Sequence, residues 1–220
     1  ILLYTDYVSY EVFVADDCSS DFTSDLEEFV EGISVIHNKE NLVFIKNCNC
    51  AARTARGKYI VFLNNDTQVQ LNWLYPLVKC MESYENAGIV GSKLVYPDGS
   101  LQEAGGIIWN NADGWNYGKG GNPDSLEYNY VREVDYVSGA AMMISKELWD
   151  DIGGFDERYV PAYYEDADLA FEVRRRGKKV LYQPDSAVVH FEGISNGKRL
   201  DEWVKKYQAV NQNRFWKKWK

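Results

Sequence analysis

Apolar residues follow two different spacings along the chain, and their alternation predicts an α/β fold. Nearly continuous apolar runs at residues 10–17, 34–38, 58–63 and 87–96 are typical of short buried strands. Between such runs, apolar residues recur every three or four positions, as at residues 71–81, which is typical of a helix packed on one face. Strands that alternate with helices predict a mostly parallel sheet flanked by helices.

The pattern changes after residue 96. Residues 97–129 are rich in Gly, Asn, Asp and Trp and predict a long irregular region. Because long loops inside a domain usually carry function and this one holds several aromatic residues, we interpret it as an ordered binding region. The later elements that the pattern predicts are a strand at 134–144, a helix ending at Gly153, a helix at 163–177, short strands at 178–184 and 186–193, and a C-terminal helix.

Composition narrows the class of protein. The chain has 220 residues, 45% of them hydrophobic, which favours one globular domain of ordinary size. Its net charge of −9 argues against nucleic-acid binding, which needs a basic face. The four cysteines form no C-x-x-C pair, so we expect free thiols in a reducing cytoplasm rather than a zinc site. No apolar run reaches the roughly 18 residues that a membrane-spanning helix needs.

Acidic and amide side chains follow predicted strands at two places. Asp16 and Asp17 end one strand, and "NNDT" at residues 64–67 follows another. Since parallel strands end at the same edge of a sheet, these groups could together hold a divalent cation such as Mg²⁺ or Mn²⁺. Ordinary turn chemistry explains "NNDT" equally well. A receiver domain also carries acids after two strands, but it would leave the last 100 or so residues unexplained.

Five segments carry a more specific signal. They read "VFVADDCSSD", "GKYIVFLNNDT", "VDYVSGAAMMI", "GGFDERYVPAYYEDADLAFEVRRRG" and "VLYQPDSAVVHFEGIS". In this order they resemble the motifs of the inverting family-two glycosyltransferases, and the similarity runs from about Tyr4 to Ser195. The resemblance implies a GT-A fold, which is Rossmann-like, and transfer of a sugar from a nucleoside diphosphate to a hydroxyl group.

The resemblance assigns residues to the sugar-nucleotide donor. Asp16 and Asp17 would bind the base or the ribose. Asp66, with Asn65 beside it, would stand where the family has its D-x-D motif and would meet the diphosphate. Gly139 would let a sugar approach the backbone closely.

The same resemblance implies a metal site for Mg²⁺ or Mn²⁺. Asp66 would be its main ligand, and His190 matches a histidine that completes the site in some family members. Asn64 stands where the family often has an acid, and its amide oxygen is a weaker ligand than a carboxylate. A histidine that merely ends an edge strand is the alternative interpretation of His190.

For the chemical step, Asp166 matches the family's catalytic base. It would take the proton of the attacking acceptor hydroxyl. Glu165 and Asp168 would bind the acceptor or support the base, and Trp115 in the irregular region would contact the acceptor. A capping role is the alternative for this acidic cluster, because acids are favoured at a helix amino end.

The family pattern also suggests how the chain is organised. We expect a single domain over 1–220, with a nucleotide-sugar half at 1–96, an acceptor half at 97–195 and a C-terminal helix at 196–220. The family's first strand has no counterpart in the sequence, so we expect it and part of the donor site to precede Ile1. Val43 stands near a position where the family usually has Gly.

We expect the partners to be a UDP- or dTDP-sugar donor and a saccharide or lipid-linked acceptor in bacterial surface polysaccharide synthesis. A C-terminal cluster of tryptophans and lysines could rest on the inner face of the cytoplasmic membrane, although a helix packed on its own domain is the simpler interpretation. Two other functions stay open: a non-catalytic sugar- or nucleotide-binding module on the same fold, and a sugar-phosphate nucleotidyltransferase. The residues of this cluster are Trp203, Trp216, Trp219, Lys205, Lys206, Lys217, Lys218 and Lys220.

Overall fold

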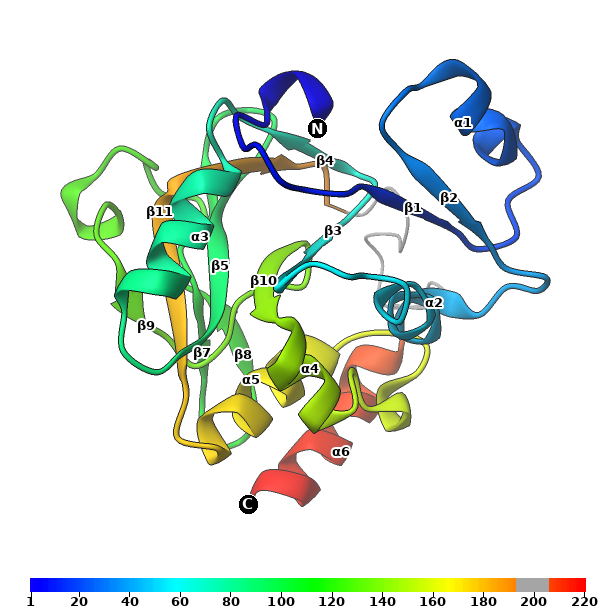
Figure 1. The fold of residues 1–220 in the computed structure, drawn as a ribbon. Helices are drawn as coiled ribbons and strands as arrows, with labels where there is room; N and C mark the ends of the chain where they lie inside the picture. The colour runs from blue at the N-terminus through cyan, green and yellow to red at the C-terminus, as the bar shows by residue number, and fades with distance from the viewer. Residues whose placement is uncertain (193–205) are drawn as a thin grey trace.

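The computed structural model describes residues 1–192 and 206–220, and they form a layered α/β structure (Figure 1). The α-helices are α1 (Leu26–Phe29), α2 (Val43–Ala52), α3 (Leu74–Ser83), α4 (Lys146–Ile152), α5 (Glu165–Arg175) and α6 (Tyr207–Trp219). Short 3₁₀ helices are η1 (Leu2–Tyr4), η2 (Phe22–Asp25), η3 (Leu126–Tyr128) and η4 (Glu157–Tyr159). The strands are β1 (Phe13–Asp16), β2 (Ser34–His37), β3 (Tyr59–Leu63), β4 (Thr67–Val69), β5 (Ala87–Val95), β6 (Leu101–Glu103), β7 (Gly106–Ile108), β8 (Gly114–Asn116), β9 (Arg132–Glu133), β10 (Ala141–Ser145) and β11 (Lys179–His190).

The main sheet is mixed, whereas the sequence predicted a mostly parallel one. Its central strands follow the order β3-β10-β5-β11-β4, with β6 beside β5 and β9 beside β11. Strands β5 and β11 are parallel, but β10 runs antiparallel to both of its neighbours, β3 and β5. The reason is the connection: the chain reaches β10 from the loop at 134–140, at the edge where β3 ends, so β10 must run back across the sheet. Strands β1 and β2 form a separate parallel pair.

Strand β11 is one long element, although the sequence predicted two short strands in its place. Pro184 suggested the break, because proline cannot donate to a strand ladder. The structure accommodates it with a register shift between Gln183 and Ala187 in the pairing with β5, after which the strand continues to His190. The second half of β11 can therefore pair with β4 and place His190 opposite Thr67.

Side chains on both faces of the main sheet are buried, as expected for a sheet covered by helices. Met142 and Ile144 of β10 belong to one core cluster, which includes residues of α2, α4 and α5. Met143 points to the opposite face and joins a second cluster that includes Leu77 and Val78 of α3. The alternation along β10 follows directly from the two-residue period of a strand. Packing on both faces therefore holds the main sheet, and the polar residues that follow its strands, in a defined position.

The region at 97–129, predicted to be irregular, contains short paired strands. Strands β7 and β8 form an antiparallel hairpin, and β6 pairs with β5. All four cysteines are free thiols, as predicted. None of the helices within residues 1–192 and 206–220 combines the length and apolarity that a membrane crossing requires.

The C-terminal helix α6 packs on the domain. Asn211 and Phe215 are buried, and Lys218 and Trp219 bind acidic side chains of α5 or beside it, so two members of the predicted membrane cluster face inward. Trp216 remains exposed. Two further members of that cluster, Trp203 and Lys205, lie outside the described residues, as does the first part of the helix expected at 196–220.

Candidate active site

Asp16 ends strand β1 and is almost completely buried. Its Oδ1 accepts a hydrogen bond from the backbone N–H of Ser19 at 3.0 Å, and its Oδ2 lies 3.3 Å from Nδ1 of His37 on β2. Hydrogen bonds from Ser19, with a smaller contribution from His37, lower the pKa of Asp16. Asp16 is therefore a fixed carboxylate at the end of the strand.

Asp17 organises the start of helix α2. Its Oδ1 accepts from the backbone N–H of Leu42 at 2.7 Å and from Nδ2 of Asn38 at 3.0 Å. Val43, which follows Leu42, has a φ of +58°, a backbone conformation that a β-branched residue adopts only under constraint. The structure thus explains why the family usually has Gly near this position. The hydrogen bond from Leu42 to Asp17 anchors the first turn of helix α2.

Asp66 and His190 form a pair at the ends of β3 and β11. Oδ1 of Asp66 lies 3.2 Å from Nε2 of His190, and both side chains are largely buried. The imidazole of His190 lowers the pKa of Asp66. On its other side, Nδ1 of His190 lies 3.1 Å from Oε1 of Gln102, which orients the ring. Oδ1 of Asp66 is nevertheless buried without a well-formed hydrogen bond to any described residue.

This pair fits a divalent cation. A carboxylate oxygen without a hydrogen bond and an imidazole nitrogen 3.2 Å away are suitable ligands, and the cation would satisfy both. Among the described residues, no group of three or more His, Cys, Asp or Glu side chains could hold a metal by itself. Two protein ligands suffice where substrate phosphates complete the coordination. Asn64 is partly buried in the same turn, where its backbone carbonyl accepts from the hydroxyl of Thr67 at 2.6 Å.

Asp166 lies in the first turn of α5 and contacts the loop before β10. Its Oδ2 accepts from the backbone N–H of Gly139 at 3.2 Å, and its Oδ1 accepts from the N–H of Ala167 at 2.7 Å. Burial raises the pKa of Asp166, although these two N–H groups oppose the rise. An added Cβ at Gly139 would lie 3.7 Å from Cβ of Asp166, an ordinary contact. Packing within the protein therefore does not require a glycine here.

Glu165 is buried next to Asp166, and its Oε2 has no hydrogen-bond partner among the described residues. Burial, reinforced by the charge of Asp166, raises the pKa of Glu165 well above its usual value. The two residues before it, Tyr163 and Tyr164, have φ values of +75° and +73°. Two consecutive tyrosines in the left-handed region are strained, and such strain concentrates at functional sites.

Glu103 on β6 is a third carboxyl group in this area, and the sequence gave no indication of it. Glu103 is buried, and its Oε1 accepts a hydrogen bond from the backbone N–H of Ser138 at 2.9 Å. Burial raises the pKa of Glu103 to about 8, and the charge of Asp166 adds to the rise. Both Gln102 and Glu103 are buried although they point to opposite faces, so no hydrophobic alternation marks this strand.

Hydrogen bonds connect the separate polar clusters. Gln102 contacts His190, and its neighbour Glu103 binds Ser138 next to Gly139, which binds Asp166. The backbone N–H of Asn64, two residues before Asp66, also donates to the carbonyl of Ala140 at 3.0 Å.

Helix α2 continues this connection toward β1. Phe44 lies beside Gly139, and Asn47 donates to the carbonyl of Ala15 at 3.1 Å. Burial raises the pKa of the Cys48 thiol, and the negative charges of Glu165 and Asp17 add to the rise. The sites predicted around Asp17, Asp66 and Asp166 therefore share one side of the molecule.

Asp168 belongs to a different set of contacts. Its carboxylate accepts from the hydroxyl of Tyr159 at 2.9 Å, from Nζ of Lys218 at 2.8 Å and from Nε1 of Trp219 at 2.7 Å. It is completely buried by these groups. Of the two roles predicted for Asp168, these partners favour support of α5 over acceptor binding, and both roles stay predictions.

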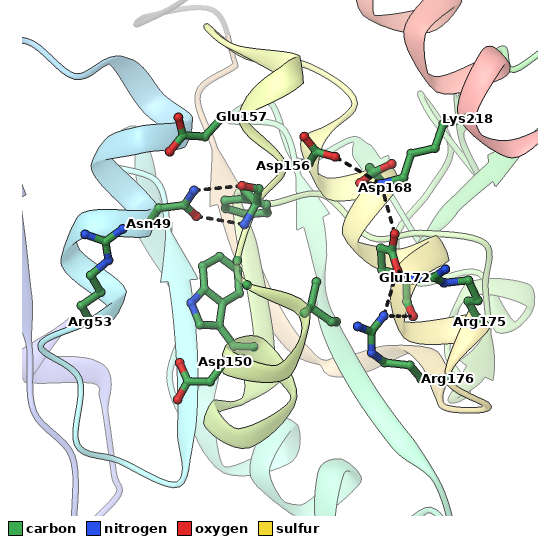
Figure 2. A pocket seen from close by; sticks show the side chains of 15 residues that line it. Asn49, Arg53, Asp150, Asp156, Glu157, Asp168, Glu172, Arg175, Arg176 and Lys218 are labelled. Atoms are coloured by element: carbon green, nitrogen blue, oxygen red, sulfur yellow. Dashed lines mark hydrogen bonds and ion pairs between the residues drawn. The ribbon is translucent and has the colours of Figure 1, made fainter.

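A charged cavity of about 480 Å³ lies on this supporting side, between α2, α4 and α5 (Figure 2). Figure 2 shows Lys218 reaching Asp156, Asp168 and Glu172, at 3.2, 2.8 and 3.1 Å. The cavity is not lined by Asp17, Asp66 or Asp166. Most of its charged groups pair with one another, so we regard it as a structural ion network rather than the active site.

Trp115 lies on the β7–β8 hairpin and is 61% exposed. Its ring packs edge to face against Trp109, with ring centroids 5.5 Å apart. It also lines a second cavity of about 490 Å³. The hydroxyl of Tyr136 donates to Asn116 at 3.0 Å and ties the hairpin to the segment before Gly139.

The fold and this acidic edge define an α/β glycosyltransferase domain. The chain belongs to glycosyl transferase family 2: the family model matches residues 2–152. The GT-A fold expected from the sequence is confirmed by the crystal structure of GalNAc-T7 with UDP, GalNAc and Mn²⁺. That structure superposes with a TM-score of 0.72 at 16% identity, over 93% of this chain and 42% of the other.

Curated relatives are similar in sequence. The O-antigen biosynthesis protein RfbC of Myxococcus xanthus is 30% identical over 155 residues, which cover 67% of this chain and 12% of the relative. The N-acetylglucosaminyl-diphospho-decaprenol L-rhamnosyltransferase of Mycobacterium tuberculosis is 26% identical over 151 residues, covering 64% and 49%. The chain thus spans half or less of the length of these relatives.

Proposed function

We propose that this domain transfers a sugar from a nucleoside diphosphate to a hydroxyl group of an acceptor, with inversion at the anomeric carbon and with a divalent cation. The observation that carries the proposal is the chain of contacts from Asp66 and His190 through Glu103 and Gly139 to Asp166. These contacts support a single site in which the proposed cation ligands and a carboxylate of raised pKa act together.

The residues on the donor side would divide the work as follows. Asp16 and Asp17 would accept hydrogen bonds from the base or ribose. Asp66 and His190 would hold Mn²⁺ or Mg²⁺, with Asn64 and Asn65 in the same turn. When bound, the cation would offset the charge that develops on the departing diphosphate.

Asp166 would accept the proton of the acceptor hydroxyl. Its raised pKa brings it closer to neutral pH, which makes the carboxylate a stronger base than an exposed aspartate. The N–H of Gly139 would keep Oδ2 in place while the hydroxyl attacks. A single displacement with one base and no covalent intermediate inverts the anomeric centre. Burial, with the charge of Asp166, raises the pKa of Glu165 and so favours the protonated carboxyl, which could donate a hydrogen bond to the acceptor.

The relatives favour a cell-surface glycan as the product. One is named for O-antigen biosynthesis and another for rhamnosyl transfer to a decaprenol-linked sugar. We therefore propose a saccharide or lipid-linked acceptor and a UDP- or dTDP-sugar donor. Action at the inner face of the cytoplasmic membrane, with Trp216 and Lys220 near the lipid, stays a prediction that sedimentation with anionic vesicles would test.

The decisive experiment incubates the protein with UDP-, dTDP- and GDP-sugars in the presence and absence of Mn²⁺ and measures the products. Release of nucleoside diphosphate with glycosylated acceptor supports the proposal. Release of pyrophosphate would identify a nucleotidyltransferase, and metal-dependent binding without any turnover would identify a binding module.

A matched pair of variants tests the role of the base. Asp166→Asn should abolish transfer and leave donor binding, measured by calorimetry, nearly unchanged. Glu147→Gln removes an exposed carboxylate on α4 and should keep the wild-type rate. Near-normal transfer by Asp166→Asn would assign the base to another residue.

A further inference from the structure

Asn211 of α6 binds the loop that leads into the candidate active site. The residue is completely buried, and its Nδ2 lies 2.6 Å from the carbonyl of Tyr159, 2.8 Å from that of Ala162 and 3.1 Å from that of Tyr163. Arg214 donates to Oδ1 of Asn211 at 2.9 Å, which requires the amide nitrogen to face the loop. One side chain thus gathers three backbone carbonyls, one at the end of η4 and two in the loop that follows it.

The loop that Asn211 holds is strained. Tyr163 and Tyr164, directly before Glu165 and Asp166, both have positive φ values. A conformation of this kind costs energy and persists only where surrounding contacts enforce it. The hydroxyl of Tyr164 donates to the carbonyl of Ala112 at 2.8 Å, so the loop is held from the β7–β8 hairpin as well as from α6.

We infer that Asn211 is a positioning residue, which holds the backbone at residues 159–163 so that α5 begins with Asp166 facing Gly139. This inference rests on the proposed function. Without the amide, the buried carbonyls of Tyr159 and Ala162 lose the hydrogen bonds from Asn211, as does the part-buried carbonyl of Tyr163, and the tyrosine pair is free to relax to ordinary φ values. Helix α5 would then begin in a different direction, and Asp166 would move away from the N–H of Gly139. Asp17, Asp66 and His190, which are proposed to bind the sugar nucleotide and its cation, lie on other elements and would not move.

The test measures transfer and donor binding separately. In Asn211→Ala we expect kcat to fall by at least about tenfold, because a displacement near 1 Å is enough to misalign a catalytic group. The dissociation constant for UDP with Mn²⁺, measured by calorimetry, should stay within about twofold. Asn213→Ala is the matched control on the same helix: this exposed amide binds only the carbonyl of Ala209 and should leave both quantities unchanged.

A second control separates positioning from general stability. Leu77→Ala creates a cavity under α3, in the other core cluster, and should lower the melting temperature. At temperatures below that melting temperature, its kcat should equal that of the wild type. If Asn211→Ala does not fold, Asn211→Ser keeps one donor and should show a smaller fall in kcat with unchanged UDP binding. Wild-type kcat in the folded Asn211 variant, or equal losses of kcat and of UDP binding, would overturn the inference.

The inference can fail independently of the proposed function. Absence of transfer by the wild-type protein would refute the function and says nothing about Asn211. Hydrogen exchange of the amides at 163–168 needs no activity. We expect these amides to exchange faster in Asn211→Ala than in wild-type protein or Asn213→Ala, and equal rates would show that Asn211 does not hold the loop.

Discussion

Replacing Glu103 with Gln should stabilise the protein at alkaline pH. Burial raises the pKa of Glu103 from 4.5 to about 8, with the carboxylates of Asp166 and Glu192 adding to the rise and the N–H of Ser138 opposing it. The folded state thus binds this proton more tightly than the unfolded state, so stability falls as pH rises from about 4.5 to about 8. At about 1.4 kcal/mol per pKa unit, the ionised group costs at most roughly 5 kcal/mol above pH 8.

Glutamine is neutral at every pH and keeps an oxygen that can accept from Ser138. Urea unfolding followed by tryptophan fluorescence at pH 5, 7 and 8.5 should therefore give similar free energies for wild type and Glu103→Gln at pH 5. At pH 8.5 the variant should be more stable by roughly 2–5 kcal/mol. Glu147→Gln controls for the loss of one negative charge. A stability difference that does not grow between pH 5 and pH 8.5 would refute a raised pKa for Glu103.

Three further predictions follow from single contacts. Val43→Gly should raise the free energy of unfolding by about 1 kcal/mol, because glycine adopts the φ of +58° without strain; a less stable variant would show that the valine side chain matters more. Asp66→Ala should weaken Mn²⁺ binding in the presence of UDP by at least about tenfold in calorimetry, and unchanged affinity would place the cation elsewhere. Lys218→Met should cost roughly 2 kcal/mol in urea unfolding, because the buried carboxylate of Asp168 loses a cation, whereas exposed Lys217→Met should change stability by less than about 0.5 kcal/mol.

The strand ends were the part of the site most accessible from sequence. Asp16 and Asp66 were predicted at strand ends because apolar runs mark buried strands and polar residues mark where they stop. The shared sheet edge expected for them was wrong, because β1 pairs with β2 in a separate sheet. The direction of β10 was not predictable in this way, because the same run of apolar residues fits a strand of either orientation. The two short strands predicted around Pro184 were wrong for a related reason. Proline alone indicates a strand end, whereas pairing with β5 before and after it lets β11 continue.

Long-range contacts explain what the sequence missed. Glu103 lies in a short strand with no alternation, and only its burial beside Ser138 gives it an unusual pKa. Asp168 shares its motif with Asp166, but the two carboxylates have different partners. Asp166 accepts a hydrogen bond from Gly139, whereas Asp168 accepts one from Lys218 of α6. Glu165 and Asp168 received one predicted role, although Asp168 binds Lys218 of α6 and Oε2 of Glu165 has no hydrogen-bond partner among the described residues.

The placement of β10 has a consequence for dissecting the chain. Strand β5 precedes residue 96, yet its two long neighbours in the sheet, β10 and β11, both follow it. A fragment ending at 96 would leave β5 with open edges on either side and would separate Asp66 from His190. Residues 1–96 and 97–195, the predicted donor and acceptor halves, therefore share one sheet, and work on either specificity needs both together, with exchanges confined to the β7–β8 hairpin.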